Sequence, residues 1–153
     1  MLDAMYSVCI DISAKIEAWD KDSIVAIAND HQIALCAPAA VKQKAVAMLK
    51  TKEPVQFALL AIFAYLAVRP KLAEIRRITI DLDYSGAVAH RIIVRRLVEL
   101  IRRDRPEFRA SWIRIDNVAG HRADLLAREV YRGLRKEDGE IQWEQIEQLL
   151  SSQ

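Results

Sequence analysis

Hydrophobic and polar residues alternate along the first third of the chain. Apolar side chains occupy every second position over residues 6–17, and the positions between them are mostly polar. Two further runs, residues 23–28 and 32–37, flank a polar connection at residues 29–31. A period of two predicts strands, and a short polar connection between two strands predicts a hairpin. The opening third is therefore predicted to form an antiparallel meander of three strands.

The pattern changes after residue 38. Residues 39–49 and 55–68 are rich in helix formers without turn residues, and each segment follows a proline that the first helical turn tolerates. Two β–α units come next, with strands predicted over residues 75–83 and 111–118 and helices over residues 87–103 and 121–135. A final amphipathic helix is predicted over residues 141–150.

This order predicts an α/β fold. Three antiparallel strands followed by two β–α units indicate a mixed five-stranded sheet, in the order β-β-β-α-β-α-β-α, flanked by helices. The helix after the hairpin and the C-terminal helix are additions to this plan. At 153 residues the chain is long enough for one domain with its own core. We place that domain at residues 1–136, with residues 137–153 as an acidic helix packed on it or on a partner.

The composition indicates a cytoplasmic protein. The longest apolar run, residues 57–68, is too short to span a bilayer and predicts a buried helix, so no membrane partner is expected. The first residues lack the pattern of a signal peptide. Cys9 and Cys36 lie inside predicted strands, where we expect reduced, buried thiols. No glycine-rich phosphate loop is present, so no organic cofactor is predicted.

Four aspartates occupy positions where a strand or a helix could bring them together. Asp11 lies within the first predicted strand, where aspartate is disfavoured. Asp81 and Asp83 end the fourth strand, in the stretch ITIDLDYSG, and Asp124 lies in the first turn of the helix after the fifth strand. If the first and fourth strands are parallel neighbours, Asp11 and Asp81 lie side by side and Asp124 can reach them.

Crowded carboxylates repel one another unless divalent cations neutralise them, and oxygen-only ligands suit Mg²⁺ or Mn²⁺. Two such ions about 4 Å apart are the usual arrangement for in-line attack on a phosphodiester. The sequence therefore predicts a two-ion site. Simpler explanations remain open, because aspartate is common where a strand ends in solvent and acids are favoured in the first turn of a helix.

The same motifs resemble the ribonuclease H-like superfamily over about residues 6–135. VCIDIS is similar to the first strand of the family. ITIDLDY is similar to its fourth strand, in which a hydrophobic run ends in a metal-binding aspartate with a tyrosine three residues on. GHRADLLAREV is similar to its last motif, in which a glycine–histidine loop precedes an aspartate that opens a helix. The resemblance implies that Asp11, Asp81 and Asp124 bind metal, that Tyr84 is the matching tyrosine, and that His121 serves in proton transfer or product release.

The chain departs from this family at one carboxylate. The family has a glutamate in the first turn of the helix after the hairpin, and here Gln56 stands at the best-aligned position. Either Glu53 or Asp83 could complete the site. Two functions therefore stay open. One is a metal-dependent nuclease that cleaves RNA, RNA–DNA hybrid or structured DNA, and the other is a catalytically degenerate module that binds nucleic acid or protein.

Charge is unevenly distributed along the chain. Residues 69–136 hold 15 Arg and 2 Lys against 9 acids, a net charge of +8, whereas residues 137–153 hold 5 acids and no base. Arginine is well shaped to grip phosphate, so nucleic acid is the predicted partner. The predicted contacts lie on the helix over residues 87–103 and are Arg91, Arg95, Arg96, Arg102 and Arg103. Ion pairs with Glu99 or with the acidic tail are the competing explanation, and that tail could cover the basic face within a monomer or across a homodimer.

Overall fold

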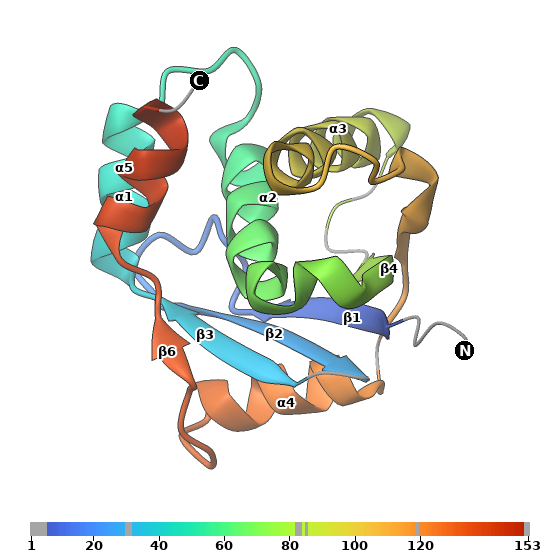
Figure 1. Cartoon of the computed structure of the whole chain (residues 1–153). Coiled ribbons are helices and arrows are strands. Elements are labelled where there is room, and N and C mark those ends of the chain that lie inside the picture. Colours follow the sequence, from blue (N-terminus) through green and yellow to red (C-terminus); the bar gives the residue numbers. More distant parts are fainter. Residues whose placement is uncertain (1–5, 30–31, 82–83, 85, 119, 152–153) are drawn as a thin grey trace.

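The structure, a computed structural model, describes residues 6–29, 32–81, 84, 86–118 and 120–151. The strands are β1 (Tyr6–Ser13), β2 (Ser23–Asn29), β3 (Ile33–Ala37), β4 (Ile75–Asp81), β5 (Ile113–Asp116) and β6 (Gly139–Glu140). The α-helices are α1 (Ala39–Met48), α2 (Val55–Val68), α3 (Ala87–Asp104), α4 (Arg122–Tyr131) and α5 (Trp143–Ser151). Two 3₁₀ segments, Arg69–Glu74 and Ala110–Trp112, precede β4 and β5. Figure 1 shows α2 and α3 on one face of the sheet and α4 on the other.

The strands form one mixed sheet in the order β5-β4-β1-β2-β3-β6. β1 pairs antiparallel with β2, and β2 pairs antiparallel with β3, which completes the expected meander. β4 lies parallel to β1, and β5 lies parallel to β4. The predicted α/β class, with a mixed sheet flanked by helices, is therefore confirmed.

The predicted number of strands was wrong, because the sheet has six strands instead of five. The sixth, β6, is only two residues long and lies parallel to β3, with Gly139 opposite Leu35. Hydrogen bonds on both sides hold it there: the Asp138 amide donates to the Ala34 carbonyl at 2.7 Å, and the Ile141 amide donates to the Cys36 carbonyl at 2.7 Å. Two residues are too few to produce an alternating pattern, so the sequence carries no sign of this strand.

The second face of β1 is largely buried, and the burial of the Asp11 carboxylate is not what the alternation of apolar and polar residues predicts. Val8 and Ile10 point into the main core with α2 and α3, whereas Cys9 lies on the opposite face, against Val118 and Ala123 at the start of α4. Both faces of β1 are covered because the chain returns across the second face of the sheet after β5. Asp11 is consequently only 6% exposed, although it is a carboxylate.

Helix α2 is the centre of the core. Every residue from Ala58 to Val68 is buried. Together with the 3₁₀ turn that follows, the segment Val55–Glu74 has the length and apolar composition of a membrane span, with a mean hydropathy of 1.4. However, 67% of the most apolar 18-residue window of that segment is buried within the fold, and the expectation of a buried helix is confirmed.

Helix α4 is shorter than predicted because a glycine ends it. Gly133 has φ +75°, a conformation that favours glycine. The Gly133 amide donates to the Val130 carbonyl at 3.0 Å, and the Leu134 amide donates to the Glu129 carbonyl at 2.9 Å. This pair of hydrogen bonds is the Schellman arrangement, which terminates helices at a left-handed residue.

The C-terminal helix α5 packs on the rest of the chain beside α1 (Figure 1). Ile141, Ile146 and Leu149 join the main hydrophobic core. The Arg103 guanidinium donates to the Leu149 carbonyl at 2.8 Å, which satisfies one carbonyl at the end of the helix. Residues 137–151 thus contribute to the same core as the sheet.

Candidate carboxylate site

Three aspartates lie in one row where the parallel strands β1, β4 and β5 end. Asp81 pairs with Asp116 of β5, and the register of β1 with β4 runs through Ile10 opposite Ile80, so Asp11 and Asp81 occupy the next position of each strand. Each aspartate follows an isoleucine, Ile10, Ile80 or Ile115, that packs in or against the main core. Because successive side chains of a strand point to opposite faces, all three aspartates lie on the face of the sheet that carries α4. The first and fourth strands are thus parallel neighbours, which is the arrangement under which Asp11 and Asp81 were predicted to lie side by side.

The fourth aspartate reaches this row from α4. The carboxyl groups of Asp124 and Asp11 share a hydrogen bond, and Asp124 also accepts hydrogen bonds from the Gly120 amide at 2.8 Å and from the Arg128 guanidinium at 2.9 Å. Burial alone would raise the pKa of Asp124, but these three hydrogen bonds and the charge of Arg128 together hold it below its ordinary value.

The connection between β5 and α4 brings Asp124 to the row of aspartates. Val118 is fully buried, and the His121 amide donates to the Val118 carbonyl at 2.9 Å, so the chain turns sharply into the helix. Gly120 has φ +80°, which glycine adopts without strain. The Val118 amide in turn donates to Asp81 at 3.0 Å. One oxygen of Asp81 thus holds the connection that presents Asp124.

We tested whether these residues suit a divalent cation. Asp11 and Asp124 supply two adjacent carboxylates of low exposure, which is the type of ligand that Mg²⁺ and Mn²⁺ bind. Within the part of the chain that the structure describes, no three His, Cys, Asp or Glu residues form a group that could hold a metal ion. Asp83, a predicted ligand, lies outside the described residues. Asp11 and Asp124 are therefore of the type that binds such a cation, and Asp81 lies in the adjacent strand.

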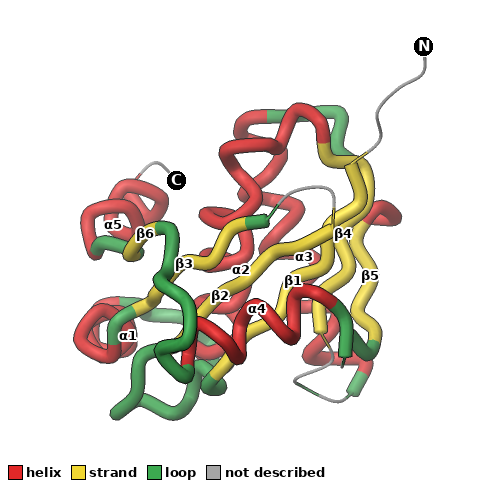
Figure 2. The backbone as a smooth tube through the Cα atoms, turned by 90° about the horizontal axis from the view of Figure 1, so that it is seen from below, coloured by secondary structure: helices red, strands yellow, loops and turns green. Residues whose placement is uncertain are grey.

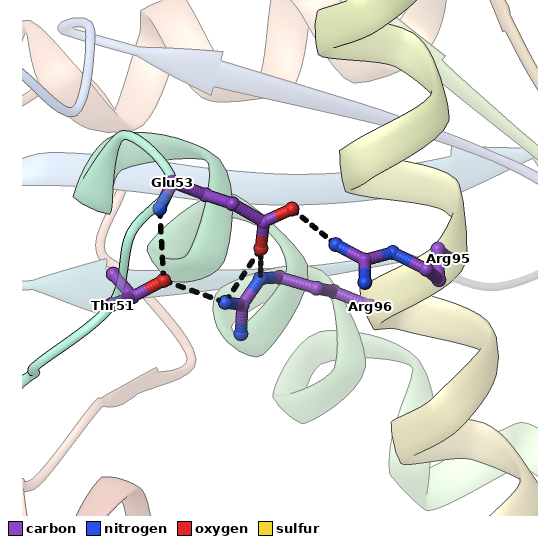
Figure 3. Close-up of polar contacts among 4 residues, drawn as sticks. All are labelled: Thr51, Glu53, Arg95 and Arg96. Atoms are coloured by element: carbon purple, nitrogen blue, oxygen red, sulfur yellow. Dashed lines mark hydrogen bonds and ion pairs between the residues drawn. The ribbon is translucent and has the colours of Figure 1, made fainter.

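Glu53 points to α3, where its carboxylate is paired. The carboxylate accepts a hydrogen bond from the Arg96 guanidinium at 2.9 Å and forms an ion pair with Arg95 (Figure 3). Thr51 joins the group through its hydroxyl, which accepts a hydrogen bond from Arg96 at 2.9 Å. Among the residues that the structure describes, Glu53 is thus held by two arginines and belongs to no group of metal ligands.

His121 is exposed and stands immediately before the first residue of α4. Its side chain makes no capping hydrogen bond to the helix. The Tyr84 hydroxyl donates to Glu17 at 2.8 Å, and its ring packs edge-on against Phe57 with centroids 5.1 Å apart. Tyr84 thus links the segment after β4 to the start of α2.

Most of the predicted nucleic-acid contacts on α3 have partners within the chain. Arg95 and Arg96 bind Glu53, Arg102 donates to the Phe108 carbonyl at 2.8 Å, and Arg103 caps α5. Of the two partners considered for the sequence, the C-terminal segment does contact α3, through the Leu149 carbonyl that binds Arg103, whereas Glu53 and the Phe108 carbonyl were not foreseen as partners. Arg91 is exposed on the same helix.

Two residues of the site were not predicted. Asp116 was not among the predicted site residues, but it ends the edge strand β5 opposite Asp81 and so joins the carboxylate row. Arg128 was given no role, although it contacts Asp124 directly. The spacing of four residues between an acid and an arginine within a predicted helix indicates such a contact, so this signal was available in the sequence.

Comparisons with family models, with curated proteins and with solved structures found no match to this chain. The function of the site must therefore follow from its own chemistry.

Proposed function

We propose that this chain is a ribonuclease H-like, Mg²⁺- or Mn²⁺-dependent nuclease that cleaves phosphodiesters of RNA, RNA–DNA hybrid or structured DNA. Asp11, Asp81 and Asp124 would hold the cation, with Asp83 as the candidate for a further ligand. We also propose that it acts in the cytoplasm, which is supported by two buried cysteines that form no disulfide.

The observation that carries this proposal is that β1 and the first turn of α4 bring the carboxyl groups of Asp11 and Asp124 into contact. Two carboxylates from distant elements are costly to bring together in a site of low exposure, since they repel when both are ionised. A divalent cation removes that cost, and it would supply charge neutralisation for the attacking and leaving oxygens of a phosphodiester. The parallel pairing of β1 with β4 supports the same proposal, because it places Asp81 beside Asp11.

Each residue of the site would have a separate role in binding the cation or in the reaction. Asp11 lies opposite Ala26 in the antiparallel pairing of β1 with β2, which fixes its place in the sheet. Arg128 and the Gly120 amide keep Asp124 ionised, and an ionised carboxylate is the form that binds a cation. The Val118 amide orients Asp81. His121 is exposed beside the site, where it could exchange a proton with a leaving group.

Cation binding can be tested without a substrate. We would titrate Mn²⁺ into the wild type and into Asp124→Asn by calorimetry, with Asp20→Asn, at an exposed aspartate outside the row, as the control. We expect one or two binding events in the wild type and in the control, and none in Asp124→Asn. Equal binding by all three proteins would show that the cation sits elsewhere.

The activity requires a second experiment. A labelled panel of single-stranded RNA, RNA–DNA hybrid, duplex DNA and branched DNA would be incubated with Mn²⁺ and with wild type or Asp81→Asn. Cleavage by the wild type that is lost in the variant supports the nuclease and identifies its substrate. No cleavage by a wild type that binds Mn²⁺ would reject the activity and leave the cation site.

A second candidate is a binding module without activity. Glu53 supports it, because this carboxylate is engaged by Arg95 and Arg96. Salt-dependent binding of nucleic acid, together with neither Mn²⁺ binding nor cleavage, would favour the module.

A further inference from the structure

Helix α4 covers only part of the second face of the sheet. It packs on β1, β2 and β3, where small side chains such as Ala26, Ala28 and Ala34 allow the helix to lie close. Figure 2, seen from the α4 side, shows α4 in front of β1 and β2, with β4 and β5 beside it. No helix within the described ranges crosses β4 and β5 on this side.

The uncovered part of this face is polar. Ile78 and Ile80 of β4 and Ile113 of β5 point into the main core, so the alternate residues point to the α4 side. We call this surface the β4–β5 shelf. Its members are Arg77, Thr79 and Asp81 of β4 together with Arg114 and Asp116 of β5.

Basic groups on the shelf lie directly beside the carboxylate row. Arg114 pairs with Thr79, and the next pair on the same face of the sheet, two residues along, is Asp81 with Asp116. Two residues along a strand span about 6.7 Å, so the arginine row lies about 7 Å from the carboxylates. Two stacked nucleotides of one strand cover about the same length. An arginine on the shelf can therefore contact a phosphate next to one held at the carboxylate row.

The shelf arginines are available for a ligand. Arg77 is exposed, and the Arg114 side chain is 70% exposed. Arg114 is 3.6 Å from Asp116, whose side chain is 59% exposed, and an ion pair between two such groups contributes little. On α3, by contrast, four of the five predicted arginines are held by Glu53 or by backbone carbonyls.

We propose that the β4–β5 shelf binds the sugar–phosphate backbone of a single nucleic-acid strand, with Arg77 and Arg114 on phosphates adjacent to the carboxylate row. This inference rests on the proposed function for the identity of the ligand. Arginine binds phosphate oxygens in a bidentate manner, and the Thr79 hydroxyl is a further donor. An open, flat face suits a polymer strand, whereas small molecules bind in concave pockets. Contacts of this kind position the strand without reading its sequence.

The test measures binding in EDTA, so that neither cleavage nor a cation contributes. Fluorescence anisotropy of a labelled 20-nucleotide single-stranded RNA would be recorded at several salt concentrations. The test variant is Arg77→Gln/Arg114→Gln. The matched control is Arg132→Gln/Arg135→Gln, which removes the same charge from two exposed arginines at the end of α4 and just beyond it. A third variant, Arg77→Lys/Arg114→Lys, keeps the charge.

We expect the shelf variant to bind more weakly and the slope of log K against log salt to fall by about 1.4, since each phosphate contact of a single strand contributes about 0.7. We expect the control to keep the wild-type slope, and the lysine variant to keep most of it. An equal loss in the shelf variant and the control would overturn the proposal, as would no binding by the wild type.

The outcome is distinguishable from failure of the proposed nuclease activity. A slope change in the shelf variant, together with no cleavage by the wild type, would support the shelf and reject the activity. Cleavage by the wild type, together with a shelf variant that behaves like the control, would support the activity and reject the shelf.

Discussion

The carboxyl groups of Asp11 and Asp124 share a hydrogen bond although 113 residues separate them in the chain. Asp11 is fixed in the central strand β1, and Asp124 lies in the first turn of α4. The contact exists because the chain passes from β5 across the end of β4 and returns over β1. This relationship makes the end of the parallel strands the chemically distinctive place in the fold.

Acid should weaken the fold through this pair. The pKa of Asp124 lies below its ordinary value of 3.8, so the folded state binds fewer protons than the unfolded state in this range. The stabilisation from Asp124 is therefore complete above pH 3.8 and is lost as the pH falls through the lowered value. We expect the wild type to lose more stability than Asp124→Asn between pH 5 and pH 2.5, measured by urea unfolding. Parallel pH profiles for the two proteins would contradict this.

Replacing Glu53 by glutamine should affect stability and leave cation binding unchanged. Glu53 joins Arg95 and Arg96, and partly exposed pairs contribute up to about 1 kcal/mol each. We expect Glu53→Gln to lower the free energy of unfolding by about 1 kcal/mol and to bind Mn²⁺ like the wild type in a calorimetric titration. Glu99→Gln, on the exposed side of α3, is the control for charge alone. Weaker Mn²⁺ binding by Glu53→Gln would make this residue a ligand after all.

A buried lysine should be among the most sensitive positions of the fold. Lys42 of α1 is fully buried, and its ammonium group donates to the carbonyls of Ile16 and Ala18 and to the Ser23 hydroxyl at 2.8 to 3.2 Å. Lys42→Met keeps an unbranched side chain of similar length and removes these three hydrogen bonds, although the Ala18 carbonyl retains the Lys21 amide as a donor. We expect a loss of about 3 kcal/mol in urea unfolding. Lys44→Met, at an exposed position of the same helix, should change stability by less than about 1 kcal/mol. Similar values for both variants would refute a structural role for the buried ammonium.

Cys36 should resist alkylation while the protein is folded. Burial raises the pKa of its thiol to about 11, and the nearby carboxylates of Asp22, Glu137 and Glu140 act in the same direction. Since the thiolate is the reactive form, the thiolate fraction at pH 8 falls about 100-fold relative to a thiol with the ordinary value of 9.0. In a Cys9→Ser variant, we expect iodoacetamide to react at least 100 times more slowly with the native protein than with the urea-unfolded protein. The native rate should rise about tenfold per pH unit. Equal rates in the two states would contradict this protection.

Much of the fold follows from local patterns. The runs over residues 23–28 and 32–37, which flank a polar connection, and the apolar run over residues 55–68 predicted β2, β3 and α2 nearly to the residue. These features depend on the period of side chains along one element, so the sequence contains them directly. The order of elements then led to a mixed α/β sheet, since two β–α units favour parallel strands beside the meander.

The sequence by itself determined most of the elements, and it marked Asp11 as a residue disfavoured within a strand, with Asp81 and Asp124 at positions where the fold could bring them beside it. Only the tertiary structure decided what surrounds them. The pairing of Glu53 with α3, the burial of both faces of β1, the strand β6 and the exposed β4–β5 shelf all depend on how distant segments pack. The spacing of side chains along one element does not indicate which other element covers them, because burial and charge pairing are set by contacts between elements. For this reason the carboxylates could be predicted from the chain, whereas their partners on other elements could not.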